Sequence, residues 1–342
     1  MSYPEYIPLK CISRIERRYP GIYSILDSIS YDGKREIDVV SKIVNPFQNK
    51  MIADIVDKKE MDVKDAKRIA FSDFIFLLIT KEWIHSKQVY SFSREFLDIL
   101  CDMDDYELNP DLFNFLPFSS FYIEIPEDNR FHGVLIRYSQ EEKMIYYCIC
   151  HKKLFGLYGG CNAFALDLKQ FNRFSDFARI NNDVANDRKK REIYESTKGL
   201  LCMVFQICMY LCSENADIDE NEEQKRIYKP SIKVKNRYSE IRKWDVGFRV
   251  MREHNKTKSD AEKEWQCKYS GLRQRPRMHW RKAHWHTYWC GKERNIRRVK
   301  FIAPILVNSV ADDELPVVNR AQWFKHSLSF KKGCVFLGIE LR

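Results

Sequence analysis

The sequence lacks an apolar run long enough to cross a lipid bilayer. Its two longest apolar stretches are Ile69–Ile79, interrupted by Ser72 and Asp73, and Leu200–Cys212, interrupted by Gln206. Both are shorter than the roughly 20 residues that a transmembrane helix needs. The beginning of the chain, MSYPEYIPLK, also lacks the basic and then apolar pattern of a secretory signal. We therefore expect a cytoplasmic protein with no membrane partner.

Several sequence patterns of cofactor and metal sites are also missing. The 11 cysteines contain no C-x2-C pair, which argues against a zinc knuckle and favours a reducing compartment. The glycines form neither a Walker loop nor a G-x-G-x-x-G loop, and Gly159-Gly160 is typical of a turn. No G-x-S-x-G, kinase or deaminase motif is present. We expect no cofactor.

The composition is that of a folded protein, with 44% hydrophobic and 31% charged residues over 342 positions. The first 110 residues have the apolar spacing of helices, over Ser13–Ile29 with a division at Pro20-Gly21, Ile37–Val56 with a break at Asn45-Pro46, Val63–Ile84, and Arg94–Leu100. Ser93 is the expected N-cap of the last helix.

After residue 116 the spacing of apolar residues changes from that of helices to that of strands. Four segments rich in β-branched and aromatic residues are separated by turns, which predicts an antiparallel meander. These segments are Phe121–Ile125, Phe131–Tyr138, Met144–Cys150 and Asn162–Leu168. A helix over 193–212, apolar nearly all round, is expected to be buried behind this meander. Its cysteines, Cys202, Cys208 and Cys212, are best interpreted as small core residues.

The rest of the chain is more polar. Six acids between 214 and 223 are followed by eight basic residues between 225 and 243, as in an exposed connector. We predict a helix over Trp244–Glu253 with Trp244, Phe248 and Met251 inward, and a loop over 255–259. A strand is expected over Val299–Val307, and Pro304 indicates that it lies at a sheet edge or is bulged there. Two further strands are expected at 327–330 and 334–340.

The expected fold class is therefore α+β, with a central antiparallel meander backed by a buried helix. We divide the chain into a helical N-terminal region (1–110), a central α+β domain (111–225) and a basic C-terminal β unit rich in Trp and His (226–342).

The C-terminal region contains the most informative stretch, RPRMHWRKAHWHTYWCG at 275–291. It holds three of the seven Trp and three of the eight His. The window 271–300 has ten Lys or Arg against the single acid Glu293, and so carries +9 of the total charge of +10. Cations interleaved with aromatic rings suit a polyanion, because cations neutralise phosphates and rings stack on unpaired bases. The proposed nucleic-acid-binding residues are Arg275, Arg277, Arg281, Lys282, Arg297 and Arg298.

An alternating strand over 284–289 would present two different faces. His284, His286 and Tyr288 would point to one side, while Trp285, Thr287 and Trp289 would form a buried aromatic side. Two imidazoles and a phenol beside guanidinium groups make His284, His286 and Tyr288 candidate acid–base residues of a metal-free ribonuclease. The same pattern is also typical of a strand that binds RNA without cleaving it, or that only packs. Zinc binding by His279, His284 and His286 is disfavoured by the cationic surroundings.

The same block resembles a known family. The run at 275–291, followed by VKFIAPILVNS at 299–309, is similar to the C-terminal block of an anti-CRISPR family found on phages and plasmids. The best-known member of that family lowers production of a type V-A CRISPR effector nuclease. Weaker similarity covers LPFSSFYIEIP (116–126), GVLIRY (133–138), GLLCMVFQICMYLCSENADI (199–218) and WDVGFRV (244–250). The resemblance spans roughly residues 110–310, and it does not identify the target.

Three hypotheses of function follow. The resemblance implies a protein that recognises a specific target segment, for example a nascent peptide, and lowers its expression through RNA or ribosome-associated contacts. The basic aromatic block alone is also compatible with a metal-independent ribonuclease. A third alternative is a DNA-binding regulator of a mobile element, although no helix-turn-helix spacing with a basic recognition helix is present.

Overall fold

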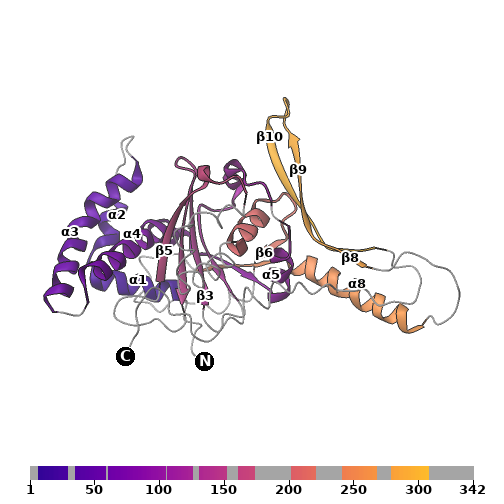
Figure 1. Ribbon diagram of the computed structural model, residues 1–342, viewed down its shortest axis with the longest axis horizontal. Helices are drawn as coiled ribbons and strands as arrows, with labels where there is room; N and C mark the ends of the chain where they lie inside the picture. Colours follow the sequence, from indigo (N-terminus) through magenta and orange to yellow (C-terminus); the bar gives the residue numbers. More distant parts are fainter. Residues whose placement is uncertain are drawn as a thin grey trace, which may run out of the picture. The chain divides into compact units, whose positions relative to one another are not determined.

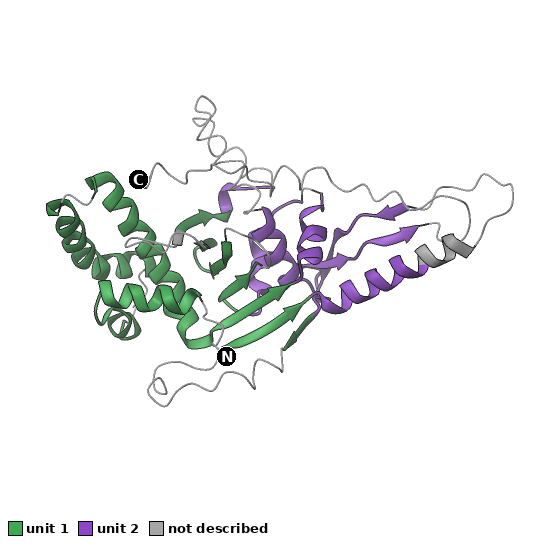
Figure 2. Cartoon of the chain, turned by 90° about the horizontal axis from the view of Figure 1, so that it is seen from below, with its two compact units in different colours: residues 1–92, 118–168, 218–246 green, residues 93–117, 169–217, 247–342 purple. Residues whose placement is uncertain are grey.

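The computed structural model describes residues 7–29, 35–58, 61–104, 106–125, 131–151, 161–173, 202–220, 241–267 and 279–307. The chain forms two compact units, each assembled from three separate stretches (Figure 2). Unit 1 contains residues 1–92, 118–168 and 218–246, and unit 2 contains residues 93–117, 169–217 and 247–342. Each unit thus includes residues from all three regions that we distinguished in the sequence.

The N-terminal part of unit 1 is helical, as predicted. Its helices are α1 (Ile7–Arg18), α2 (Ile22–Asp27), α3 (Glu36–Asp57) and α4 (Val63–Ser86). Gly21 separates α1 from α2 with a left-handed φ of 77°, at the division that the sequence indicated. The expected break at Asn45-Pro46 is wrong, because α3 continues through Pro46. Buried residues on both sides of that proline hold α3 in the helical core.

The other described part of unit 1 is a seven-stranded sheet, in the order β5-β4-β3-β2-β1-β7-β6. The antiparallel meander is confirmed and comprises β2 (Ser120–Glu124), β3 (Phe131–Ser139), β4 (Met144–His151) and β5 (Cys161–Asp167). The other strands are β1 (Gln88–Phe92), β6 (Ile218–Glu220) and β7 (Arg242–Val246). β1 lies between β2 and β7 and is parallel to both.

Three of these strands were not expected. We assigned residues 88–92 to the helical N-terminal region, residues 218–220 to an exposed connector, and Trp244 to a helix, but they lie in β1, β6 and β7. A strand as short as β1 has too few residues to show a period of its own, and its pairing partners lie far away in the sequence.

One face of the sheet is covered by α4 (Figure 1). Side chains of the meander on that face, including Tyr122, Leu135, Tyr146 and Cys148, join the helices of unit 1 in one core. α4 is buried continuously from Phe74 to Thr80. We predicted a buried helix behind the meander at 193–212, and its described part, residues 202–212, belongs to unit 2.

The described residues of unit 2 form α5 (Arg94–Cys101), the 3-10 helix η1 (Pro110–Phe115), the helix over 202–212, α8 (Phe248–Cys267) and four short strands. A short 3-10 helix, η2 (Leu168–Gln170), spans the sequence boundary between the two units. Ser93 caps α5 as predicted, since its hydroxyl accepts a hydrogen bond from the Phe96 amide at 3.2 Å. The loop predicted over 255–259 is wrong, because α8 runs through it. Met251 is buried as expected, but Phe248 is exposed.

Several expectations fall outside the described residues. These are the turn at Gly159-Gly160, the first part of the 193–212 helix, most of the charged connector, the strands at 327–330 and 334–340, and the positions of Arg275 and Arg277. Among the helices that are described, none is both long and apolar enough to cross a membrane.

Asp217 holds the start of α8 within unit 2. Its buried carboxylate accepts hydrogen bonds from the backbone amides of Arg249 at 2.6 Å and Val250 at 3.3 Å, and it also pairs with the Arg249 guanidinium. A carboxylate stabilises a helix N-terminus because the first amides have no partner within the helix.

We therefore expect Asp217→Ala to destabilise unit 2 by about 2 kcal/mol, and Asp217→Asn, which keeps an acceptor oxygen, by less. Hydrogen exchange of the first-turn amides of α8 is the measurement. Equal protection of these amides in wild type and Asp217→Ala would contradict this role.

Candidate nucleic-acid interface

The block at 279–307 folds into a β-hairpin and a second pair of short strands. β9 (His284–Cys290) pairs antiparallel with β10 (Ile296–Ile302), and β8 (His279–Arg281) pairs antiparallel with β11 (Ile305–Val307). The single strand predicted over Val299–Val307 is in fact two, because β10 ends at Ile302 and β11 begins at Ile305, on either side of Ala303-Pro304. Gly291 opens the hairpin turn with a φ of 87°, which a residue with a side chain rarely adopts.

The base of the hairpin is anchored in the core of unit 2. Trp285 and Phe301 are buried and in edge-to-face contact, with ring centroids 5.6 Å apart. The indole Nε1–H of Trp285 donates to Gln206 Oε1 at 2.7 Å, on the helix over 202–212. Asn215 exchanges two hydrogen bonds with the Phe301 backbone, at 2.7 and 2.9 Å. These contacts fix which face of the hairpin is buried.

The predicted alternation is confirmed, but the predicted burial of that face holds for Trp285 and is wrong for Trp289. Both residues lie on the same face of β9, yet Trp289 is 57% exposed. The reason is that the covering layer ends before the hairpin does, and the distal half of the hairpin extends away from the rest of unit 2 (Figure 1). Alternation in one strand indicates which residues share a face, but not how far that face is covered.

The opposite face presents the three candidate acid–base residues together. His286 is exposed, and its ring is nearly parallel to that of Tyr288, with 6.2 Å between centroids. Lys300, opposite His286 on β10, places its ammonium 5.1 Å from the centre of the Tyr288 ring. His284 is half-buried, and its Nδ1 lies 3.3 Å from the Lys282 carbonyl oxygen. The face thus combines two imidazoles, a phenol and an ammonium.

The basic residues of the block fall into two groups. Three of those proposed to bind nucleic acid are paired with acids of unit 2: Lys282 with Asp102 at 3.3 Å, Arg297 with Glu107 at 3.1 Å, and Arg298 with Glu214 at 3.8 Å. Arg298 also lies 3.7 Å over the Phe115 ring. Within the part of the chain that the structure describes, the other group pairs with no acid, and its members are Arg281, Lys292, Arg294 and Lys300.

The basic residues that pair with acids help to hold unit 2 together, whereas those without an acidic partner are available to bind phosphates. A guanidinium that already pairs with a carboxylate must give up that partner before it can neutralise a phosphate. The sequence gives no indication of the pairing, because Asp102, Glu107 and Glu214 lie far away along the chain. Of the six residues proposed from sequence, Arg281 is thus the one described residue that is exposed and has no acidic partner.

The hairpin is better suited to binding a ligand through aromatic rings and cations than to metal or thiol chemistry. Among the described residues, no three His, Cys, Asp or Glu side chains gather as metal ligands would. Burial raises the pKa of the thiols of Cys101, Cys208 and Cys212, which disfavours the reactive thiolate form. What the hairpin offers is therefore a surface of exposed rings for stacking, together with positive charge.

Comparisons with known proteins agree with this architecture. A family model described as AcrVA2-like, anti-CRISPR type V subtype A2 family, matches residues 90–309. The crystal structure of AcrVA2 superposes with a TM-score of 0.54 at 14% sequence identity, covering 89% of this chain and 100% of that one, which indicates a shared fold. No curated protein sequence matches. The matched segment is more than half of the chain and includes both the sheet and the hairpin, so the protein belongs to the AcrVA2-like anti-CRISPR family.

Proposed function

We propose that this anti-CRISPR protein lowers the expression of a CRISPR effector nuclease, and that its C-terminal block acts in this by contacting RNA. In this proposal another part of the chain recognises a segment of the target protein, such as its nascent peptide. Family membership supports the anti-CRISPR role. The RNA contact is our inference from the hairpin.

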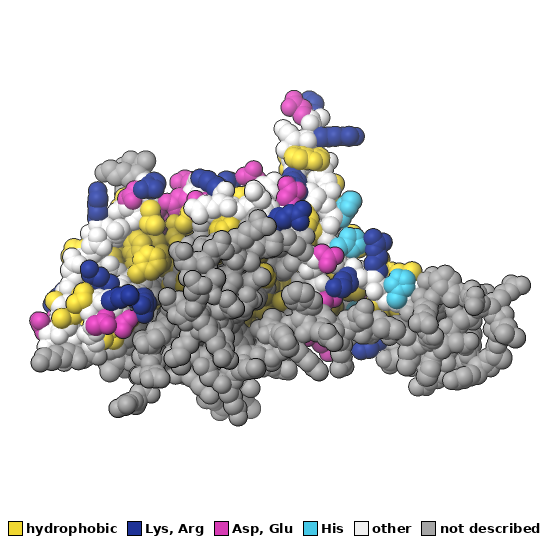
Figure 3. All heavy atoms as spheres, in the orientation of Figure 1, with side chains coloured by type: hydrophobic (Ala, Val, Ile, Leu, Met, Phe, Trp, Pro, Cys, Tyr) yellow, Lys and Arg dark blue, Asp and Glu magenta, His cyan; other side chains and the backbone are white. Residues whose placement is uncertain are grey.

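One observation carries the RNA contact. Arg281, Lys292, Arg294 and Lys300 pair with no acid among the described residues, and they lie in the same block as the exposed rings of His286 and Trp289. Figure 3 shows Lys and Arg side chains close to an exposed hydrophobic patch near the hairpin tip. Unpaired cations bind phosphates by releasing counterions, and exposed rings stack on unpaired bases.

RNA binding is expected to depend on the unpaired cations. Replacing Arg281, Lys292 and Lys300 together by Ala should weaken binding of a labelled single-stranded RNA. It should also reduce the salt dependence, by about 0.7 in the slope of log K against log salt for each lost phosphate contact. Fluorescence anisotropy between roughly 50 and 200 mM salt measures both quantities.

The matched control removes the same charge from unit 1. Lys42, Lys50 and Lys67 are exposed on α3 and α4 and pair with no acid among the described residues, so their triple Ala variant has the same net charge. It should bind RNA like wild type. Equal weakening in both triple variants would show a nonspecific effect of net charge and contradict an RNA site on the hairpin.

The same assay separates the alternatives. Duplex DNA in place of RNA tests the DNA-binding hypothesis, and cleavage of the RNA in the presence of EDTA would indicate a metal-independent ribonuclease. In cells, the protein should reduce both the mRNA and the protein level of a type V effector nuclease, and the hairpin triple variant should restore them. Restored levels with the unit 1 triple variant would point to a site elsewhere.

A further inference from the structure

The hairpin tip has a feature that the general attraction between cations and RNA does not explain. Trp289 is an exposed indole on a strand whose other Trp is buried, and beside it lies Arg294 of the turn. A shallow hollow of about 460 Å³ is lined, among the described residues, by these two side chains.

We propose that this hollow holds one unpaired nucleotide of an RNA strand, with its base stacked on Trp289 and its phosphate on Arg294. This inference rests on the proposed function and adds to it a defined contact. An exposed indole loses little conformational freedom when a flat ring stacks on it, and every base offers such a face. A guanidinium binds a phosphate through two parallel N–H donors.

The charges around the hollow favour an anion. Lys292 and Arg294 lie in the turn and pair with no acid among the described residues. Arg297, on the same face as Trp289, is partly neutralised by Glu107. Glu293 is the one acid in the turn, and it opposes phosphate binding. The turn therefore keeps a net positive charge, which disfavours an acid-poor or basic peptide as the occupant.

The hairpin geometry keeps the two groups together. The Arg294 amide donates to the Gly291 carbonyl oxygen at 3.1 Å, which closes the turn. A Cβ added at Gly291 would lie 3.2 Å from both Asn295 Oδ1 and the Ile296 side chain. With a φ of 87° at that position, the turn depends on glycine.

The experiment measures how RNA affinity depends on the Trp289 ring, on the charges of the turn and on the bases of the RNA. We expect Trp289→Ala to weaken binding of a single-stranded RNA decamer roughly tenfold, with an unchanged salt slope because no charge is lost. Trp289→Phe should keep most of the affinity because a ring remains. Arg294→Ala should weaken binding and lower the salt slope by about 0.7. Glu293→Gln should tighten binding.

A decamer of abasic ribose phosphates provides the matched ligand. Wild type and Trp289→Ala should bind it equally, because no base is present to stack. Trp289→Ala binding to normal RNA like wild type would overturn the proposal, as would equal losses on the normal and abasic strands. Loss of anti-CRISPR activity in Trp289→Ala with unchanged RNA affinity would also overturn it, in favour of a protein contact.

These outcomes are distinct from those of the proposed function. If wild type binds no RNA, the RNA contact itself is wrong. A different result would leave the RNA contact standing: wild type binds RNA, the Arg281, Lys292 and Lys300 variant binds it less well, and Trp289→Ala binds it normally. In that case only the proposed nucleotide site at Trp289 and Arg294 is wrong. Trp289 is exposed, so its variants are expected to keep the fold, and their melting curves check this.

Discussion

Replacing Trp285 by Ala is expected to lower the free energy of unfolding of unit 2 by about 3–5 kcal/mol. Replacing Trp289 by Ala should change it by no more than about 0.5 kcal/mol. The two tryptophans lie four residues apart on the same face of β9, and differ in what covers them. Trp285 is 8% exposed and packs on Phe301, whereas Trp289 is 57% exposed.

The loss of Trp285 has two physical parts. The cavity would remove contacts from Phe301, which also touches Phe96 and Tyr210 with ring centroids 5.8 and 5.1 Å away. The buried Gln206 would lose the indole N–H that it accepts at 2.7 Å. Trp285→Phe, which keeps a ring but not the donor, should therefore cost less than Trp285→Ala.

Hydrogen exchange locates the effect within the chain, because two units need not unfold together. Faster exchange should appear in β10 and in the helix over 202–212 of Trp285→Ala, with unit 1 unchanged. A double variant, Trp285→Phe with Gln206→Leu, should recover part of the loss by removing the unsatisfied oxygen. Wild-type protection in Trp285→Ala would mean that the hairpin base is not anchored as described.

The part of the fold that depends on local pattern could be predicted from the sequence. The four strands of the meander alternate clearly and are joined by short turns, so that each pairs with its neighbour in sequence. The α4 helix and the Ser93 cap are equally local features. For the same reason, residues His284, His286 and Tyr288 could be placed on one face before the hairpin was known.

The features that were missed depend on distant partners. β1 is a strand because β2 and β7 flank it, and β7 lies more than 140 residues further along the chain. The exposure of Trp289 depends on where the layer covering the hairpin ends. Whether Arg297 is available to phosphate depends on Glu107. None of these can be obtained from the spacing of residues within one segment.

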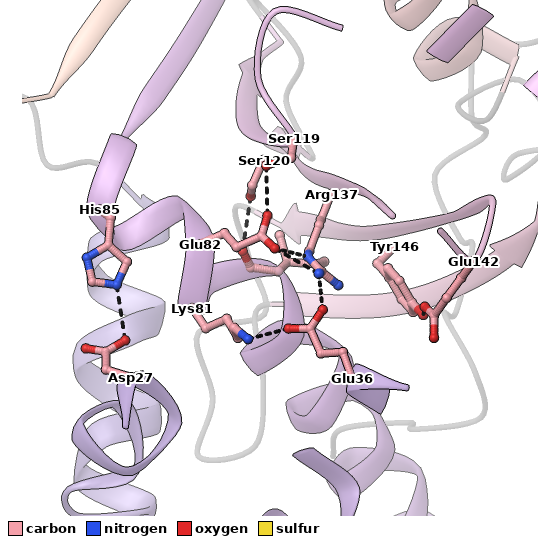
Figure 4. A network of polar contacts seen from close by, with 11 residues as sticks. Asp27, Glu36, Lys81, Glu82, His85, Ser119, Ser120, Arg137, Glu142 and Tyr146 are labelled. Atoms are coloured by element: carbon pink, nitrogen blue, oxygen red, sulfur yellow. Dashed lines mark hydrogen bonds and ion pairs between the residues drawn. The ribbon is translucent and has the colours of Figure 1, made fainter. Parts of the chain in front are cut away.

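The second large effect concerns a buried charge network in unit 1 (Figure 4). Arg137 of β3 lies between Glu82 of α4 and Glu36 of α3, and its Nε donates to Glu82 Oε1 at 2.9 Å. Glu36 also pairs with Lys81, and Glu82 accepts from the Ser119 hydroxyl at 2.8 Å. The Arg137 side chain is only 5% exposed. The network joins two helices to the sheet.

We expect Arg137→Met to lower the free energy of unfolding of unit 1 by about 3–5 kcal/mol at pH 7, since two carboxylates lose a buried cation. Burial raises the pKa of Glu36, and Arg137 opposes that rise. A carboxyl whose pKa is raised in the folded state lowers the free energy of unfolding as pH rises through that pKa. Below the ordinary pKa of the carboxyl, this loss of stability is absent. Without Arg137 the folded pKa rises further, so the destabilisation should shrink from pH 7 to pH 5.

Two further variants separate charge from packing. Arg137→Met with Glu82→Gln leaves the Glu36–Lys81 pair balanced, and should recover more than half of the lost stability. Arg35→Met breaks an exposed pair with Asp38, and should change stability by less than about 1 kcal/mol. Denaturant unfolding at pH 5 and pH 7 measures all three. A loss in Arg137→Met that is the same at both pH values, and that Glu82→Gln does not reduce, would show that Arg137 acts through packing rather than charge.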